Sequence, residues 1–199
     1  MRTVLLGPPP SEFARLLQLR KERGQDGFDE VWDGEYHVAP AAHSFHGIVA
    51  DELRAALRSP AKTAGLRGSE PFNLGASDDY RVPDGGFFRS VPNDVWVATA
   101  AIVIEVVSPD DQTFDKFEFY RNHGVEEIIV ADPAARTVRF FSTTDGFTTA
   151  VARSNLLNVA SAEIADAIDW PGGESPAPFR VDGERLPRET PTSSGVDRR

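Results

Sequence analysis

The acidic residue Glu105 interrupts an otherwise apolar segment, and its setting points more directly to chemistry than that of any other residue in the sequence. It lies within residues 101–107, where the other six side chains are alanine, isoleucine or valine. Such a run is typical of a strand covered on both faces. A carboxylate is costly to bury there unless it pairs, is neutralised or binds a metal. Glu105 therefore predicts a buried ion pair or a metal site.

Two residues elsewhere in the sequence could complete a metal site. Asp84 follows Pro83 at the end of the strand-like segment 80–82, and Lys116 lies eleven positions after Glu105 in a segment with a helical pattern. Carboxylate oxygens suit Mg²⁺ or Mn²⁺. A lysine beside them could orient an attacking water or stabilise charge on a phosphate. Two acids and a lysine on adjoining elements suggest a divalent-metal site for phosphodiester hydrolysis.

Each of these residues also has a purely structural interpretation. Glu105 could be held by an arginine or by backbone donors, and Lys116 could be a solvated surface residue. Asp84 belongs to a Pro-Asp-Gly sequence, which by itself favours a turn. The residue types and their spacing leave these alternatives open.

The surrounding segments predict the elements that would position these residues. Apolar residues at helical spacing indicate helices at residues 11–23, 44–59, 114–123 and 162–168, the second of them ending before Pro60. Alternating or continuous apolar runs indicate strands at residues 28–32, 35–38, 71–74, 80–88, 101–107, 127–131, 138–142 and 147–151. The first pair should form a hairpin around Asp33-Gly34.

The order of these elements predicts an α/β fold, in which a mixed β-sheet is flanked by helices. The strand–helix–strand unit of residues 101–131 should be a right-handed parallel crossover, and the hairpins add antiparallel strands. We expect one domain over residues 1–171, with its core at 28–142. Residues 172–199 are rich in proline, glycine, serine and charge, which predicts a disordered tail.

Composition limits the classes of function. The 199 residues include no cysteine, which excludes disulfides, thiolate metal sites and cysteine nucleophiles. No stretch approaches the roughly 18 apolar residues that a membrane span needs, and the apolar segment at the N-terminus is too short for a secretory signal. We therefore expect a cytoplasmic protein with no membrane association.

The charge of the chain bears on its partners. The net charge is −10, and residues 172–199 contain five acids and five bases, so the imbalance belongs to the rest of the chain. A nucleic-acid-binding protein normally has a basic surface, and this one can have at most a local patch. The candidates for such a patch are Arg54, Arg58, Lys62, Arg67, Arg81 and Arg89. For most of them a solvated surface is the more common role.

A series of short motifs runs in order through the middle of the chain. They are Val31-Trp32-Asp33-Gly34-Glu35, Pro83-Asp84, Val103-Ile104-Glu105-Val106-Val107-Ser108-Pro109, Asp115-Lys116, the segment 120–127 and Asp132-Pro133. Together they resemble the Uma-type family of putative restriction endonucleases, which in turn resembles the PD-(D/E)xK nuclease superfamily. The resemblance covers roughly residues 28–141, over half of the chain.

The resemblance implies a restriction-endonuclease-like fold with metal ligands at the centre of its sheet. It implies that Asp84 and Glu105 bind Mg²⁺ or Mn²⁺ and that Lys116 assists catalysis. In the superfamily the catalytic lysine usually lies two positions after the second acid, where this sequence has Val107. The Uma-type family instead carries its lysine on the following helix, where Lys116 lies. Two glycines directly after Asp84 also depart from the usual pattern, because an apolar strand is expected there.

Glu35 and His46 are further candidate catalytic residues. Members of the superfamily often take an additional acid from their N-terminal region, and Glu35 lies on the predicted hairpin. His46 lies at the start of a predicted helix and could contact phosphate or position Glu35. A structural role is the more common one for a histidine at such a place.

These observations predict a Mg²⁺-dependent endonuclease that acts on nucleic acid, with DNA as the expected substrate and a homodimer as a possible assembly. The acidic charge favours an alternative, a PD-(D/E)xK-like binding or regulatory module whose nuclease activity is weak or lost. A third candidate is a metal-dependent hydrolase of a small nucleotide, which needs no basic groove. A serine hydrolase is excluded, because Ser108 lacks the sequence context of a nucleophile elbow.

Overall fold

The strands of the computed structural model form two six-stranded sheets within the residues it describes, 3–5, 11–39, 43–108 and 112–172. The first sheet contains, in spatial order, β1 (Thr3–Leu5), β3 (Glu35–Val38), β2 (Glu30–Trp32), β6 (Asp79–Arg81), β5 (Asn73–Ala76) and β8 (Trp96–Val97). The second contains β12 (Thr149–Val151), β11 (Thr137–Ser142), β10 (Glu127–Asp132), β9 (Ile102–Val106), β7 (Gly85–Phe88) and β4 (Arg67–Ser69).

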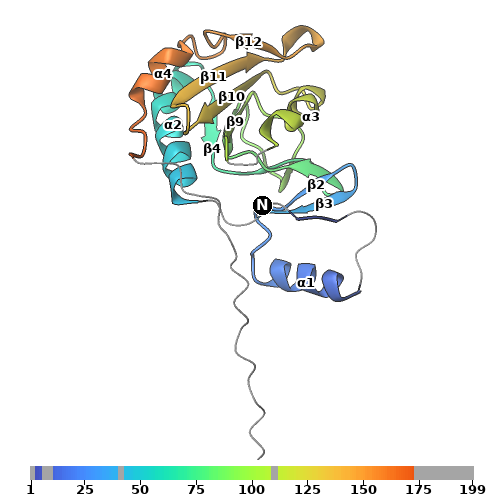
Figure 1. Cartoon of the computed structure of the whole chain (residues 1–199). Helices are drawn as coiled ribbons and strands as arrows, with labels where there is room; N and C mark the ends of the chain where they lie inside the picture. Colours follow the sequence, from blue (N-terminus) through green and yellow to red (C-terminus); the bar gives the residue numbers. More distant parts are fainter. Residues whose placement is uncertain (1–2, 6–10, 40–42, 109–111, 173–199) are drawn as a thin grey trace, which may run out of the picture.

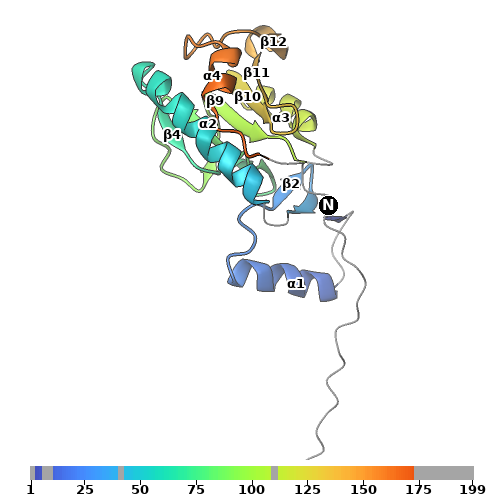
Figure 2. The same ribbon diagram turned by 60° about the vertical axis from the view of Figure 1, so that its left-hand side comes forward.

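The described residues also form four α-helices and two short 3₁₀ helices. They are α1 (Ser11–Glu22), α2 (Ser44–Thr63), the 3₁₀ helix η1 (Thr113–Lys116), α3 (Phe117–Asn122), the 3₁₀ helix η2 (Thr144–Gly146) and α4 (Ser161–Ala167). Figures 1 and 2 show α2 and α4 on one face of this sheet and α3 on the other. The predicted fold class, α/β with a mixed sheet flanked by helices, is confirmed.

The central strand β9 is buried along its whole length, as the apolar run predicted. Its residues alternate between the two faces of the sheet. Ile102 and Ile104 belong to the apolar cluster that contains Leu53 of α2, whereas Val103 belongs to the cluster that contains Tyr120 of α3. Glu105 shares the face of Val103 and is therefore directed toward α3.

The crossover between β9 and β10 is parallel, as predicted. Glu105 lies opposite Val130 in this pairing, and η1 and α3 form the connection between the strands. Gly124 ends α3 with φ +71°, a left-handed conformation that glycine adopts without a steric cost. The antiparallel neighbours β7 and β11 complete the mixed sheet.

The predicted hairpin at residues 28–38 forms β2 and β3. Asp33 and Gly34 have φ values of 50° and 84°, the positive values that a tight two-residue hairpin turn requires at both central positions. β2 also pairs with β6 through Val31 and Tyr80. This pairing brings the start of the hairpin close to the segment that leads to Asp84.

The segment 80–88 was expected to be one interrupted strand, and it forms two strands in different sheets. β6 belongs to the first sheet and β7 to the second, so the chain passes from one sheet to the other at residues 82–84. Asp84 lies in this passage, immediately before β7. The glycines that follow it do not end the strand, because Gly85 and Gly86 pair with β9.

The expectation that α2 ends before Pro60 is wrong. The helix continues to Thr63, with Pro60 inside it. Proline removes one backbone donor and usually breaks a helix. Here the last turn of α2 is stabilised by packing against the apolar core and by a backbone hydrogen bond. Ala61 is buried in the same cluster as Leu57 and Leu66, and the N–H of Ala64 donates to the carbonyl of Pro60.

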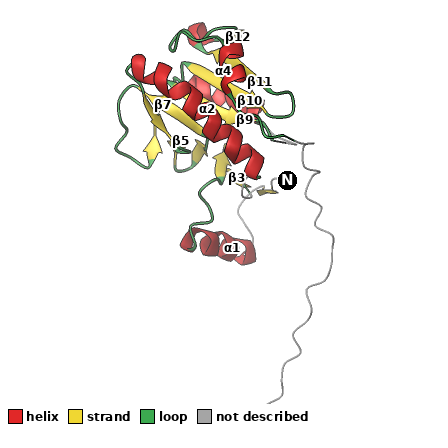
Figure 3. Ribbon diagram, turned by 90° about the vertical axis from the view of Figure 1, so that its left-hand side faces the viewer, coloured by secondary structure: helices red, strands yellow, loops and turns green. Residues whose placement is uncertain are grey.

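Helix α1 lies beside the first sheet, away from the second sheet and its helices (Figure 3). None of its residues is buried. The guanidinium of Arg20 connects it to the hairpin, because Nη2 lies 2.8 Å from Oδ1 of the buried Asp29. Within the part of the chain that the structure describes, no helix is long and apolar enough to cross a membrane. The predicted tail lies outside the described residues from 173 onward, so the domain limits stay a prediction.

Substitution of Gly86 would test how closely β7 packs against β9. A Cβ atom at this position would lie 2.5 Å from the carbonyl oxygen of Ile102 and 2.9 Å from the ring of Phe72. Because backbone cannot easily give way, we expect Gly86→Ala to lower the free energy of unfolding by about 1–3 kcal/mol. Urea denaturation followed by circular dichroism measures this loss. Gly47→Ala is the control, since Gly47 lies in α2 with nothing within 4 Å of the added atom. It should be neutral or stabilising, and equal losses in both variants would contradict the packing argument.

Candidate active site

Asp84 is held where the chain enters the second sheet. Its Oδ2 accepts a hydrogen bond of 2.8 Å from the backbone N–H of Val106, the residue that follows Glu105 in β9. Its Oδ1 lies 2.8 Å from Nε2 of His46 at the start of α2. The side chain is 18% exposed, so Asp84 lies next to Glu105 at the boundary between the interior and the solvent.

Glu105 is buried and held by two groups from the crossover. The ammonium of Lys116 lies 3.1 Å from its Oε1 and 3.4 Å from its Oε2. The hydroxyl of Tyr120, which lies one helical turn beyond Lys116, also donates to Oε1. Because an unpaired carboxylate would be very costly at this depth, these donors explain how the sheet tolerates the acid.

Lys116 contacts a second carboxylate, which the sequence analysis did not single out. Its Nζ lies 2.9 Å from Oε1 of Glu30 at the start of β2, and both side chains are almost fully buried. Glu30 also accepts hydrogen bonds from the backbone N–H of Val82, at 2.8 Å, and from the indole of Trp32, at 2.7 Å. The ammonium of Lys116 therefore lies between Glu30 of the first sheet and Glu105 of the second sheet and contacts both.

His46 connects Asp84 to the end of β9. Its Nδ1 lies 2.9 Å from the hydroxyl oxygen of Ser108, while its Nε2 faces Asp84. The side chain is 14% exposed. The order serine–histidine–aspartate is that of a hydrolase triad, but the sequence around Ser108 lacks the G-x-S-x-G pattern of a nucleophile elbow. We therefore interpret His46 as a residue that positions Asp84.

The site carries more acid than base. Burial raises the pKa of Glu105 to about 7. The Lys116 ammonium opposes this rise in pKa, whereas the negative charges of Asp84 and Glu30 add to it. Burial and the charge of Glu105 raise the pKa of Tyr120 well above its ordinary value, so the phenol stays protonated and can donate. Three carboxylates near one ammonium make an environment that favours a further positive charge.

This donor set fits a hard divalent cation in its chemistry. Among the described residues, no group of three or more histidine, aspartate or glutamate side chains is arranged to hold a metal by itself. Mg²⁺ commonly takes only one or two protein carboxylates and completes its shell with water and phosphate oxygens. Asp84 and Glu105 could supply these two carboxylates, because they lie side by side through the backbone of Val106.

The structure brings together Asp84, Glu105, Lys116 and His46 of the predicted site residues. Glu35 lies elsewhere, at the turn end of β3 opposite Trp32. The hairpin acid beside Lys116 is Glu30, five positions earlier. The i+4 spacing from Lys116 already places Tyr120 on the same helical face in the sequence, whereas Glu30 had no comparable signal.

Two of the basic residues near Asp84 have structural partners. The guanidinium of Arg81 lies over the rings of Trp32 and Phe119 and pairs with Asp79 at 2.8 Å. Arg89 pairs with Glu126 at 2.7 Å. Both arginines were candidates for phosphate binding, and these contacts favour structural roles for both.

The raised pKa of Glu105 predicts how stability depends on pH in metal-free buffer. The folded protein keeps the carboxyl protonated up to about pH 7, whereas the unfolded chain releases this proton near its ordinary pKa of 4.5. Unfolding therefore releases a proton in this window, and the contribution of Glu105 to the free energy of unfolding decreases as pH rises from about 4.5 to about 7. Compared with wild type, Glu105→Gln should lack this decrease.

Urea denaturation in EDTA at several values between about pH 5 and about pH 8 measures the difference. Glu118→Gln is the matched control, because its carboxylate is 76% exposed on α3, and its curve should run parallel to that of wild type. Parallel curves for wild type and Glu105→Gln would show that burial does not shift this carboxyl.

A second prediction separates Glu30 from Glu35. Glu30→Gln removes a buried charge from Lys116 and should lower the free energy of unfolding by about 2–3 kcal/mol. Glu35→Gln should change it by about 0.5 kcal/mol or less, as is usual away from such networks. Denaturation curves of the two variants at neutral pH make the comparison. A larger loss in Glu35→Gln would reverse the assignment of the hairpin acid.

Comparisons with known proteins identify the fold and the family of the chain. The fold is similar to the crystal structure of a "putative nuclease belonging to DUF820" from Anabaena variabilis ATCC 29413, with a TM-score of 0.58 and 18% sequence identity over 70% of this chain and 90% of that chain. At this identity the likeness shows the fold alone. No curated protein matches the chain. The model of the Uma2 family, described as "Putative restriction endonuclease", matches residues 10–166. The motifs around Asp84, Glu105 and Lys116 agree with this match. Because the match covers well over half of the sequence, the chain belongs to the Uma2 family.

Proposed function

We propose that this protein is a Mg²⁺-dependent endonuclease that hydrolyses phosphodiester bonds in DNA. The observation that carries the proposal is the placement of Asp84, immediately before β7, beside Glu105 of β9, with Lys116 held 3.1 Å from Glu105. The family and the fold of the chain support a nuclease, and the acidic donor set supports a divalent cation as its cofactor. Mn²⁺ could replace Mg²⁺ at such a site.

Asp84 and Glu105 would hold the ion. When bound, it would lower the pKa of an attacking water and neutralise charge on the scissile phosphate. Glu105 must lose its proton to act as a ligand, so its pKa of about 7 makes cation binding stronger as pH rises toward neutrality. The hydroxyl of Tyr120 keeps the carboxylate oriented, since it donates to Oε1.

Lys116 would act on the phosphate side of the site. Its ammonium sits between Glu30 and Glu105, so its position is set before any substrate arrives. A positive charge fixed in advance stabilises a developing negative charge without the cost of reorganisation. His46, hydrogen-bonded to Asp84 and Ser108, would keep the first metal ligand in place. The expected contribution of Glu35 to a second ion or to the substrate stays a prediction.

Two observations favour a second candidate function. The net charge of −10 opposes the long-range attraction of DNA. In the described structure the oxygens of both Asp84 and Glu105 also have hydrogen-bond partners within the chain. A binding or regulatory module that keeps the fold and has lost most of its nuclease activity would have these properties.

Nicking of supercoiled plasmid DNA with Mg²⁺ or Mn²⁺ tests the primary proposal. We expect Glu105→Gln, Asp84→Asn and Lys116→Met each to reduce the nicking rate by at least about 100-fold, because each removes a group that acts on charge at the reacting phosphate. Glu118→Gln, an exposed acid on α3, should nick at the wild-type rate. Full activity in the first two variants would rule out the assigned ligands.

Isothermal titration with Mg²⁺ and Mn²⁺ separates the two candidate functions. An endonuclease of the proposed kind should bind the cation in wild type and lose this binding in Asp84→Asn. A folded wild-type protein that binds neither cation at millimolar concentration, and that does not nick, would support the binding module instead.

A further inference from the structure

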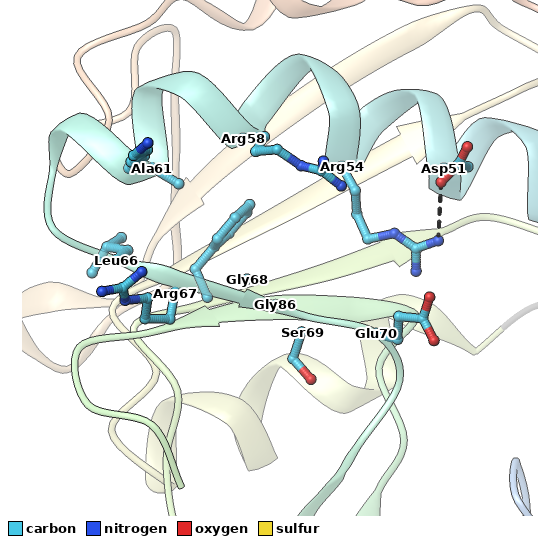
Figure 4. A pocket seen from close by; sticks show the side chains of 12 residues that line it. Asp51, Arg54, Arg58, Ala61, Leu66, Arg67, Gly68, Ser69, Glu70 and Gly86 are labelled. Carbon is cyan, nitrogen blue, oxygen red and sulfur yellow. Dashed lines mark ion pairs between the residues drawn. The ribbon is translucent and has the colours of Figure 1, made fainter.

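A pocket of about 350 Å³ lies between α2 and the strands β4 and β7, apart from the acidic cluster. Figure 4 shows Arg54 and Arg58 extending from α2 above β4, which carries Arg67 and is followed by Glu70. Lys62, from the last turn of α2, also lines this pocket. The proposed reaction makes no use of this pocket.

The pocket is basic in a protein that is strongly acidic overall. Its ionisable lining consists of Arg54, Arg58, Lys62, Arg67, Asp51 and Glu70. Four bases and two acids leave a local excess of two positive charges, against −10 for the whole chain. Three of the bases recur at every fourth residue of α2, so they lie along one face of the helix. Such a concentration of charge can attract an anion that the rest of the surface repels.

Most of these cations are available to a ligand. Arg58, Lys62 and Arg67 are exposed, and within the described part of the chain none of their side chains makes a hydrogen bond or an ion pair. In this they differ from Arg81 and Arg89, whose partners are named above. Exposed, unpaired bases that converge on one concavity are the groups that bind phosphate in proteins.

Arg54 connects the pocket to the candidate active site. Its side chain is 22% exposed and pairs with Asp51 at 3.6 Å, and its Nη1 donates to the backbone carbonyl of Asp84 at 3.3 Å. A Cβ atom at Gly85 would lie 3.3 Å from Cδ of Arg54. The glycine that follows Asp84 therefore leaves room for the arginine stem, and the pocket begins next to the proposed metal ligand.

We propose that this pocket binds backbone phosphates of the nucleic-acid strand on one side of the scissile bond. The inference rests on the proposed function, because it assigns the pocket to the same substrate. Residues 54 to 62 of α2 span about 12 Å at 1.5 Å per residue, a length over which one strand of duplex DNA carries about three phosphates. A row of bases of this length fits a polymer strand better than it fits a single phosphate. Such contacts hold the strand in register and carry no sequence preference.

The double variant Arg58→Ala/Arg67→Ala tests the pocket, and Arg15→Ala/Arg23→Ala is the matched control. Both remove two exposed arginines and so change the net charge equally, but the control positions lie in or just after α1. Binding of fluorescein-labelled DNA, single-stranded and duplex, is measured by anisotropy in EDTA over a range of KCl concentrations. Without a divalent cation the DNA stays intact, so binding is measured independently of cleavage.

We expect the pocket variant to reduce the slope of log affinity against log salt by about 1.4 for single strands and about 1.8 for duplex, as two lost phosphate contacts require. The control should keep the wild-type slope.

Equal slopes in the two variants, with wild type binding and nicking DNA, would overturn the pocket inference and leave the proposed function standing. A pocket-dependent slope in a protein that never nicks would support the pocket and refute the nuclease. Pocket-dependent binding of a deoxynucleoside monophosphate without binding of either DNA would overturn the inference in favour of a small phosphorylated ligand.

Discussion

The ammonium of Lys116, buried between the carboxylates of Glu30 and Glu105, is the interaction on which the rest of this structure depends. It joins three segments that are distant in the sequence: the first hairpin, the central strand β9 and the crossover that follows it. None of the three charges could be buried alone, because an isolated ion in the interior loses its hydration without compensation. Each charged side chain therefore makes the burial of the other two possible. Through Lys116 these contacts join Glu30 of the first sheet to Glu105 of the second.

The polar site is confined to one face of β9 by the alternation of its side chains. Ile102, Ile104 and Val106 belong to the apolar cluster that includes residues of α2 and α4, whereas Val103 and Glu105 face α3. The second sheet thus keeps a continuous apolar core on one side and has a short polar interval on the other. Asp84 reaches this interval because the chain changes sheets just before β7, and its hydrogen bond to the N–H of Val106 fixes it beside Glu105.

Charge is distributed unevenly over the molecule in a way that fits the proposed chemistry. Three acids gather around one lysine where a cation would be needed, and the bases of α2 and β4 gather around the neighbouring pocket. Arg54 touches both regions. An acidic protein can still present a phosphate-binding surface when its bases are concentrated in this manner, since short-range contacts at a concave site are less screened than long-range repulsion.

Local patterns in the sequence determined many of the elements, and only the tertiary structure decided where some of them end and which side chains meet. The apolar run around Glu105, the Asp33-Gly34 turn and the helical spacing of α2 depend on neighbouring residues, so they could be predicted. They also led to Asp84, Glu105, Lys116 and His46, which resemble the family pattern and which the fold brings together. The choice of Glu30 over Glu35 depends on the pairing of β2 with β6, in which Val31 lies opposite Tyr80, a residue distant in the sequence. The continuation of α2 through Pro60 likewise depends on the burial of Ala61. Both outcomes come from long-range packing, for which a local pattern contains no signal.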